Sequence, residues 1–239
     1  YAWICRHKSN LIFTLNAVLL HLLYIYMKTG IIVAMDKEYS QLQKVFGERN
    51  DIVLQKCGIG KVNSAIGTVE MINEHHPDLI ISSGCAGGAD TELNVMDVVV
   101  ARECAYHDAY CGDNCEDGQI MGMPARYKAP EELIEKALAL NNEEATTKII
   151  DGLTVSGEWF VDSKEKMQYI LGKFPDAKAV DMESCSIAQT CYRYNVPFVS
   201  FRVISDVPMK DTKASQYFDF WDKLAENSFE ITRKFIESL

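Results

Sequence analysis

Acidic residues stand where two apolar runs end, and these are the residues of the sequence best suited to chemistry. Asp181 and Glu183 follow the apolar run 177–180, and Asp206 follows the run 198–204. Because an ionised carboxylate is costly to bury without a partner, a carboxylate at the end of a buried strand more often belongs to a site than to the core. Each segment also carries small or hydroxyl residues. The pattern predicts a pocket that binds a polar ligand and moves protons.

The composition is that of a globular protein, and 239 residues are enough for one α/β domain with a filled core. The formal net charge is -10. An acidic balance of this size argues against a nucleic-acid partner, which needs a basic face to meet phosphates. It leaves a small nucleoside as a candidate ligand, because a nucleoside carries no phosphate.

Eight cysteines are spread along the chain, several of them inside apolar or small-residue runs such as residues 83–86. A free cysteine in such a run behaves as a small hydrophobic residue, whereas disulfide frameworks are typical of small secreted domains. We therefore expect reduced thiols in a cytoplasmic protein. His107, Cys111 and Cys115 have the spacing of a partial zinc site, but no second Cys/His pair has the spacing to supply a fourth ligand. We expect no metal.

The apolar run at residues 11–26 follows a basic segment at residues 6–8, an order that resembles a signal peptide. The run is short for a membrane span and is interrupted by Asn16 and His21. A strand pattern begins directly after Met27. We expect residues 1–26 to lie outside the fold and residues 27–239 to form a single domain. A membrane anchor is the alternative interpretation of the run, and we expect no membrane partner.

Short β-rich runs alternate with helical patterns from residue 30 onward. Near-continuous apolar strands that alternate with helices predict an α/β fold with a mixed, mostly parallel central sheet surrounded by helices. In such folds ligands bind at the carboxyl ends of the strands. Glycine-rich segments at residues 58–60 and 84–88 are expected at that edge. Strand patterns cover residues 31–34, 52–57, 77–82, 95–100, 153–156, 177–180 and 198–204, and helical periodicity covers residues 37–46, 62–73, 130–140, 163–171 and 220–236.

Seven short motifs resemble those of the 5′-methylthioadenosine/S-adenosylhomocysteine nucleosidases and occur in the same order as in that family. One glycine motif would be weak evidence, whereas the ordered set is specific, and the resemblance covers residues 27–239. The motifs are Gly-Ile-Ile-Val-Ala-Met-Asp-Lys-Glu at 30–38, Cys-Gly-Ile-Gly-Lys-Val-Asn at 57–63, Gly-Cys-Ala-Gly-Gly at 84–88, Tyr-His-Asp at 106–108, Val-Ser-Gly at 155–157, Val-Asp-Met-Glu at 180–183 and Arg-Val-Ile-Ser-Asp at 202–206.

The resemblance implies a nucleoside phosphorylase-like fold, commonly a homodimer, and an enzyme of methionine salvage. The implied reaction is hydrolysis of the N-glycosidic bond of 5′-methylthioadenosine and S-adenosylhomocysteine, which releases adenine and a 5′-thioribose. Such a reaction passes through an oxocarbenium-like transition state and needs both an acid and a base.

The resemblance implies catalytic roles for four residues, which are Asp206, Glu38, Glu183 and Arg202. Asp206 would protonate the leaving adenine beside N7, and Ser205 would orient it. Glu38 would act as the general base for the attacking water, and Arg202 would help to hold that water and the neighbouring carboxylates. From the residues alone, Asp206 also fits a helix N-cap and Glu38 a solvated first-turn glutamate.

The resemblance assigns a second group of residues to binding the ribose and the base. Glu183 would accept hydrogen bonds from the ribose hydroxyls, and Met182 would pack against the sugar. Phe160 would stack on the adenine, although packing in the core is the alternative role for this ring. The backbone of Val161 would read the edge of the base.

The remaining pocket residues rest on the resemblance alone. Ala86 and Gly87 would lie close to the ligand, since small residues let the backbone approach a flat base or a sugar. Ile59 and Phe218 would form the apolar pocket around the 5′-alkylthio group. His107 is expected near the subunit interface, where it would supply part of the partner's pocket.

Three residues depart from the commonest family pattern. Asp181 stands where Glu is usual, which shortens a ribose or base contact by one methylene. Cys85 replaces a Ser near the water and removes a hydroxyl donor. Pro208 follows the acid motif where Ala is common and would stiffen that loop. These departures bear on rate and substrate preference more than on the class of reaction.

Three other functions remain open on the sequence alone. A purine nucleoside phosphorylase must bind phosphate, yet the segment 35–38 places acidic groups after the first strand. An aminodeoxyfutalosine hydrolase uses almost the same residues, so the motifs do not separate it. A non-catalytic nucleoside-binding module would need no separated acid and base. We expect no cofactor, because the sequence has neither a Gly-x-Gly-x-x-Gly motif after the first strand nor a Walker-type motif.

Overall fold

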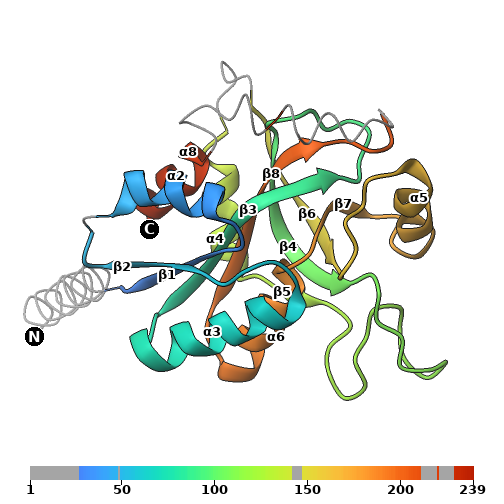
Figure 1. Cartoon of the computed structure of the whole chain (residues 1–239), viewed down its shortest axis with the longest axis horizontal. Coiled ribbons are helices and arrows are strands. Elements are labelled where there is room, and N and C mark those ends of the chain that lie inside the picture. The colour runs from blue at the N-terminus through green and yellow to red at the C-terminus, as the bar shows by residue number, and fades with distance from the viewer. Residues whose placement is uncertain (1–26, 48, 142–146, 211–219, 221–228) are drawn as a thin grey trace, which may run out of the picture.

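The computed structural model describes residues 27–47, 49–141, 147–210, 220 and 229–239, whose strands form one sheet with helices on both faces (Figure 1). Residues 1–26, expected to lie outside the fold, are not among the described residues. The sheet contains β1 (Thr29–Val33), β2 (Ile52–Lys56), β3 (Leu79–Gly88), β4 (Val98–Tyr106), β5 (Tyr127–Lys128), β6 (Ile149–Ser156), β7 (Ala177–Asp181) and β8 (Phe198–Asp206).

The predicted mixed, mostly parallel sheet is confirmed. The strand order is β2-β1-β3-β7-β6-β4-β5, and β8 pairs with both β3 and β4. Strands β3, β7, β6, β4 and β8 therefore close into a ring, with β1 and β2 extending it on one side. Five of the eight described pairings are parallel, and three are antiparallel.

Strand β3 positions much of the candidate site because it changes partner along its length. Residues 80–86 pair with β8, the register shifts between Ala86 and Gly87, and Gly87 then pairs with Val180 of β7 as well as with Asp206 of β8. The sequence prediction ended this strand at residue 82 and was wrong there. The glycine segment 84–88 continues the strand, since its backbone pairs with two neighbours.

The described helices are α2 (Asp36–Phe46), α3 (Lys61–His75), α4 (Glu131–Leu138), α5 (Lys164–Lys173), α6 (Ser184–Tyr194) and α8 (Glu230–Ser238). All of them except α6 lie close to the helical periods of the sequence, and the sequence prediction had no helix at residues 184–194. Of the period 220–236 the structure describes residues 220 and 229–236. Helices α2, α4 and α8 cover one face of the sheet, and α3 and α6 cover the other (Figure 1). Within the described ranges, no helix has the length and hydrophobicity needed to cross a membrane.

Two helices begin directly after strands and carry carboxylates at their first turns. Helix α2 follows β1 and buries Leu42 and Phe46, four residues apart on one face. That packing turns the first-turn residue Glu38 inward, where it is 2% exposed. Helix α6 follows β7 and has Glu183 as its N-cap residue. The fold thus brings Glu38 and Glu183 to the same edge of the sheet.

Candidate active site

A cavity lies where β1, β3, β7 and β8 end, and it encloses about 650 Å³, part of it open to solvent. Most of the predicted site residues line it, whereas Ala34, Met35, Trp159 and Val180 line it without having been singled out. These four are neighbours of predicted residues in the sequence. The predicted residues that line the cavity are Glu38, Ile59, Cys85, Ala86, Gly87, Phe160, Val161, Asp181, Met182, Glu183, Ser205 and Asp206.

Glu38 is held by three backbone N–H groups. Its Oε2 accepts from Ala34 and Met35, each at 3.0 Å, and its Oε1 accepts from Cys85 at 3.0 Å. Burial raises the pKa of Glu38, while the charge of Arg202 and these hydrogen bonds act in the opposite direction. The carboxylate is therefore fixed in place and has a raised affinity for a proton, as a general base requires.

Asp206 ends β8 on another side of the cavity. Ser205 Oγ lies 2.7 Å from Asp206 Oδ1 and 3.2 Å from the carbonyl oxygen of Ala86, and it donates to either. Burial raises the pKa of Asp206, and the bond from Ser205 lowers it. A Cβ added at Gly87 would lie 3.7 Å from Asp206 Oδ2, which shows how closely the β3 backbone approaches this acid.

Glu183 lines the same cavity as these two carboxylates. Its Oε1 accepts from the backbone N–H of Gly60 at 2.9 Å. Burial raises the pKa of Glu183 and so does the neighbouring charge of Asp181, whereas Arg202 lowers it. The side chain is 8% exposed and therefore offers its remaining acceptor sites to a ligand in the cavity rather than to bulk water.

Arg202 lies behind the cavity wall and is not among the described residues that line it. Its Nε donates to Asp181 and its Nη2 donates to Ser82 Oγ at 2.7 Å. Burial lowers the pKa of Arg202, but the carboxylates of Asp181, Glu183 and Glu38 raise it by more. The net pKa is therefore raised and the guanidinium stays charged. Its position fits the part of the prediction in which Arg202 holds the neighbouring carboxylates, whereas a direct contact with water in the cavity does not follow from it.

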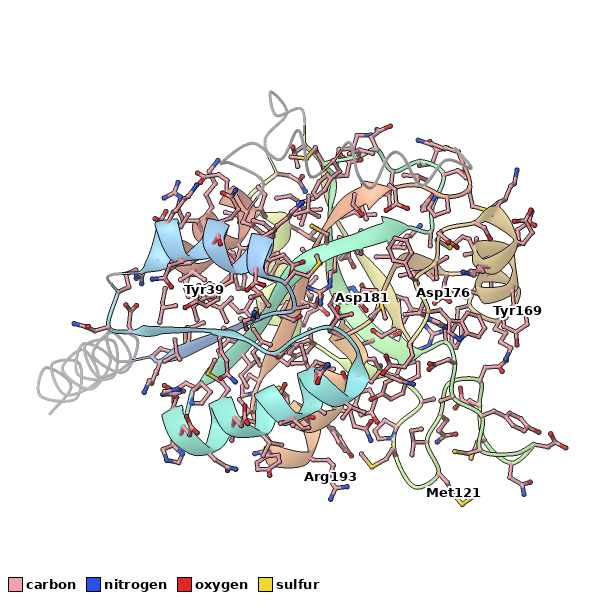
Figure 2. The ribbon with its side chains drawn as sticks, in the orientation of Figure 1. Tyr39, Met121, Tyr169, Asp176, Asp181 and Arg193 are labelled. Carbon is pink, nitrogen blue, oxygen red and sulfur yellow. The ribbon has the colours of Figure 1, made fainter. Side chains whose placement is uncertain are left out.

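Asp181 lines the cavity, but its carboxylate is already occupied. It accepts from Arg202, from the hydroxyl groups of Ser156 and Ser184, and from the backbone N–H of Ser184. Figure 2 shows Asp181 at the centre of the molecule, far inside the peripheral Met121 and Arg193. The hydrogen bonds of its carboxylate indicate that Asp181 anchors Arg202. The sequence prediction for Asp181 was a ribose or base contact and not this role.

The opposite wall of the cavity is aromatic. Phe160 is 48% exposed and Trp159 is 38% exposed, so neither ring is buried in the core. Packing in the core, the alternative role of Phe160, does not fit this exposure. Val161 is buried beside them. An exposed aromatic wall opposite acidic residues suits a flat, polar, uncharged ligand.

Among the described residues, His107, like Arg202, was predicted to belong to the site and does not line the cavity. His107 is 1% exposed and packs against Trp159 with ring centroids 5.2 Å apart. A side chain so buried in its own chain does not fit the expected role in a partner's pocket. Phe218 lies outside the described residues. Among the residues that the structure describes, no group of three His, Cys, Asp or Glu side chains is arranged to hold a metal ion.

Comparisons with known proteins agree with this geometry. The phosphorylase superfamily matches residues 28–237. The 5′-methylthioadenosine/S-adenosylhomocysteine nucleosidase of Geobacillus sp. (strain WCH70) is 35% identical over 231 residues, which are 89% of this chain and 99% of that protein.

Solved structures share the fold. That of the 5′-methylthioadenosine/S-adenosylhomocysteine nucleosidase from Colwellia psychrerythraea 34H, in complex with adenine, has a TM-score of 0.83 and 29% identity, covering 90% of this chain and 96% of that one. That of the futalosine hydrolase of Helicobacter pylori strain 26695 has a TM-score of 0.80 and 27% identity, covering 90% of this chain and 100% of that one.

Proposed function

The chain belongs to the phosphorylase superfamily and, within it, to the 5′-methylthioadenosine/S-adenosylhomocysteine nucleosidases, and from this we propose how its residues divide the reaction. The enzyme is an N-glycosyl hydrolase that releases adenine from 5′-methylthioadenosine and S-adenosylhomocysteine. The observation that carries the proposal is that Glu38 and Asp206 line one cavity from different elements, each with a pKa raised by burial.

Asp206 acts as the acid. Burial raises its pKa, which favours the protonated form that can donate to the departing adenine. Ser205 orients the carboxyl group through the contact at Oδ1. Protonation of the base lets it leave as a neutral molecule while positive charge develops on the ribose.

Glu38 acts as the general base. Three backbone donors fix its orientation and leave it facing the cavity, where a water molecule can be deprotonated for attack on the anomeric carbon. Glu183 accepts hydrogen bonds from the ribose hydroxyls, and its negative charge stabilises the positive charge of the oxocarbenium-like transition state. Met182 packs against the sugar, and Phe160 stacks on the adenine.

Water rather than phosphate is the nucleophile. The charged residues among the described lining of the cavity are Glu38, Asp181, Glu183 and Asp206, and all of them are acidic. The positive charge of Arg202 is balanced by its ion pair with Asp181. An incoming phosphate dianion would be repelled. Adenine release from 5′-methylthioadenosine should therefore proceed at the same rate with and without inorganic phosphate. A strict requirement for phosphate would refute the hydrolase mechanism.

The choice among substrates is the second question for this site. Because a futalosine hydrolase shares this fold, aminodeoxyfutalosine remains an alternative substrate for this chain. Ile59 is 50% exposed at the rim of the cavity, where an apolar 5′-thioalkyl group would contact it. We expect the specificity constant to be highest for 5′-methylthioadenosine or S-adenosylhomocysteine. A higher kcat/KM for aminodeoxyfutalosine would assign the enzyme to the other reaction.

We also propose a homodimer that works in the cytoplasm as part of methionine salvage. An apolar stripe on α3 supports self-association, since Val62 is 68% exposed and Ile66 is 53% exposed beside a groove against α6. The seven described cysteines are all free thiols, which supports a reducing compartment. Sedimentation equilibrium tests the dimer, and a strictly monomeric mass would contradict it.

A further inference from the structure

Two loops form facing parts of the cavity wall, and a small charged cluster joins them. The loop before α3 carries Ile59, and the loop after β6 carries Phe160. Between them, Glu158 Oε1 accepts from the backbone N–H of Lys61 at 2.7 Å. Lys61 is the first residue of α3, so its N–H has no acceptor within the helix and the positive end of the helix dipole favours an anionic partner.

Asp108, at the end of β4, contacts both loops at once. Its two carboxylate oxygens each accept from Lys61 Nζ at 2.8 Å. Its Oδ2 also accepts from the backbone N–H of Glu158 at 2.9 Å. Glu158, Lys61 and Asp108 therefore form a closed triangle of contacts in which each residue bonds to the other two.

The triangle is connected to the ribose end of the cavity through Gly60. The backbone N–H of Gly60 donates to Glu183. Gly60 has a φ of +94°, and a Cβ there would lie 2.6 Å from Glu158 Oε2. Such contact requires glycine, because another residue would be strained at this φ and would push Glu158 away. Glu158 is thus packed on the residue that holds the carboxylate of Glu183.

We propose that Glu158 and Asp108, with Lys61 as their shared cation, are positioning residues for the nucleoside. The proposal rests on the function proposed above. None of the three is among the described residues that line the cavity, so they act through other groups. They set the distance between the aromatic wall that receives the base and Glu183, which receives the ribose. Substitution of these residues should therefore weaken binding of the nucleoside and leave the rate of the chemical step almost unchanged.

The test compares variants of the full-length enzyme in two assays. Steady-state kinetics with 5′-methylthioadenosine separate KM from kcat, and calorimetric titration with adenine measures binding without turnover. Glu158→Ala should raise both KM and the Kd for adenine about tenfold, the size of effect expected from losing a charge-assisted hydrogen bond. The kcat should stay within about twofold, since the lost contact is made equally in the ground state and the transition state.

Conservative replacement separates positioning from bulk stability. Glu158→Gln keeps an oxygen that can accept from Lys61 N–H, so it should restore KM and Kd to near the wild-type values. Asp108→Asn keeps one oxygen for two donors and should give an intermediate effect. The double variant Glu158→Ala/Asp108→Ala should weaken binding less than the product of the single effects, because both belong to one network.

Glu165→Ala is the matched control, as an exposed glutamate on α5, and it should bind and turn over like the wild type. A Glu158→Ala enzyme with unchanged KM and Kd would overturn the inference, as would a fall in kcat alone. The wild type is measured first. If it releases no adenine, the proposed function fails; if it is active and the variants behave as the control does, only this inference fails.

Discussion

Arg202 and Asp181 form a buried ion pair at the wall of the cavity, with 2.5 Å between Nε and Oδ2 and side-chain exposures of 3% and 1%. The same guanidinium is the nearby positive charge for Glu38 and Glu183. One cation thus serves three buried carboxylates. This imbalance explains why burial prevails and the pKa values of Glu38 and Glu183 are raised.

Asp181→Asn should destabilise the enzyme, because it leaves Arg202 without its direct counter-ion in a dry site. The expected loss is about 3 kcal/mol in the free energy of unfolding, measured by urea denaturation. Asp176→Asn is the control, since Asp176 pairs with Arg126 at the surface and is 51% exposed; its loss should stay below about 1 kcal/mol. Equal losses in the two variants would contradict the account of the buried pair.

Asp206→Asn should abolish most turnover while keeping the site intact. The amide cannot donate the acidic proton to adenine, and loss of a general acid typically lowers kcat by about 10²–10⁴-fold. Adenine should still bind, as calorimetry would show. Asp90→Asn, at a carboxylate that pairs with Lys178, should turn over normally. Unchanged turnover in Asp206→Asn would remove Asp206 from the mechanism.

Much of the fold follows from local patterns, and the rest depends on contacts between distant segments. The apolar runs that became β1, β2, β7 and β8 and the helical periods that became α2 and α3 are visible because periodicity is a local property. Strand β5 has two residues and exists through its pairing with β4, so it leaves no pattern. The closure of the ring by β8 joins strands far apart in the chain, which no local pattern reports.

The candidate site divides in the same way. Glu38, Glu183 and Asp206 stand out from motif and position, and they line one cavity. The withdrawal of Arg202 from that cavity was not predictable, because it depends on acceptors supplied by Ser82 and by β7. Motifs identify which residue types a site contains. Strand register and packing determine which way each side chain points.

Glu183→Gln should make the protein more stable at alkaline pH while lowering its activity. The pKa of Glu183 is raised in the folded state from its ordinary 4.5, so the folded state binds more protons than the unfolded state. Stability contributed by this group is therefore lost as the pH rises from 4.5 toward the folded-state pKa. The neutral amide removes that loss and keeps an oxygen for Gly60.

The melting temperature should reveal this difference. At about pH 8 the Glu183→Gln enzyme should be the more stable, by about 1.4 kcal/mol for each unit by which the folded-state pKa of Glu183 exceeds its ordinary value. At about pH 4 the two enzymes should be alike, because Glu183 is then mostly protonated in both states. Glu165→Gln, at an exposed carboxylate, should show no such dependence on pH. A constant difference at both pH values would mean that the charge of Glu183 is not the source of the instability.

Gly84→Ala should displace Glu38, the proposed general base, without touching Asp206, the proposed acid. A Cβ at residue 84 would lie 2.7 Å from Glu38 Oε1 and 2.9 Å from Arg202 Nη1, closer than real contacts allow. Glu38 would have to leave its three backbone donors, so kcat should fall by about 10²-fold or more. Gly172→Ala is the control, since nothing lies within 4 Å of its added Cβ. In helix α5 that change should leave kcat unaltered and stabilise the fold by about 0.5–1 kcal/mol. If Gly84→Ala turned over as fast as Gly172→Ala, the placement of Glu38 would not matter to the reaction, and its assignment as the base would fall.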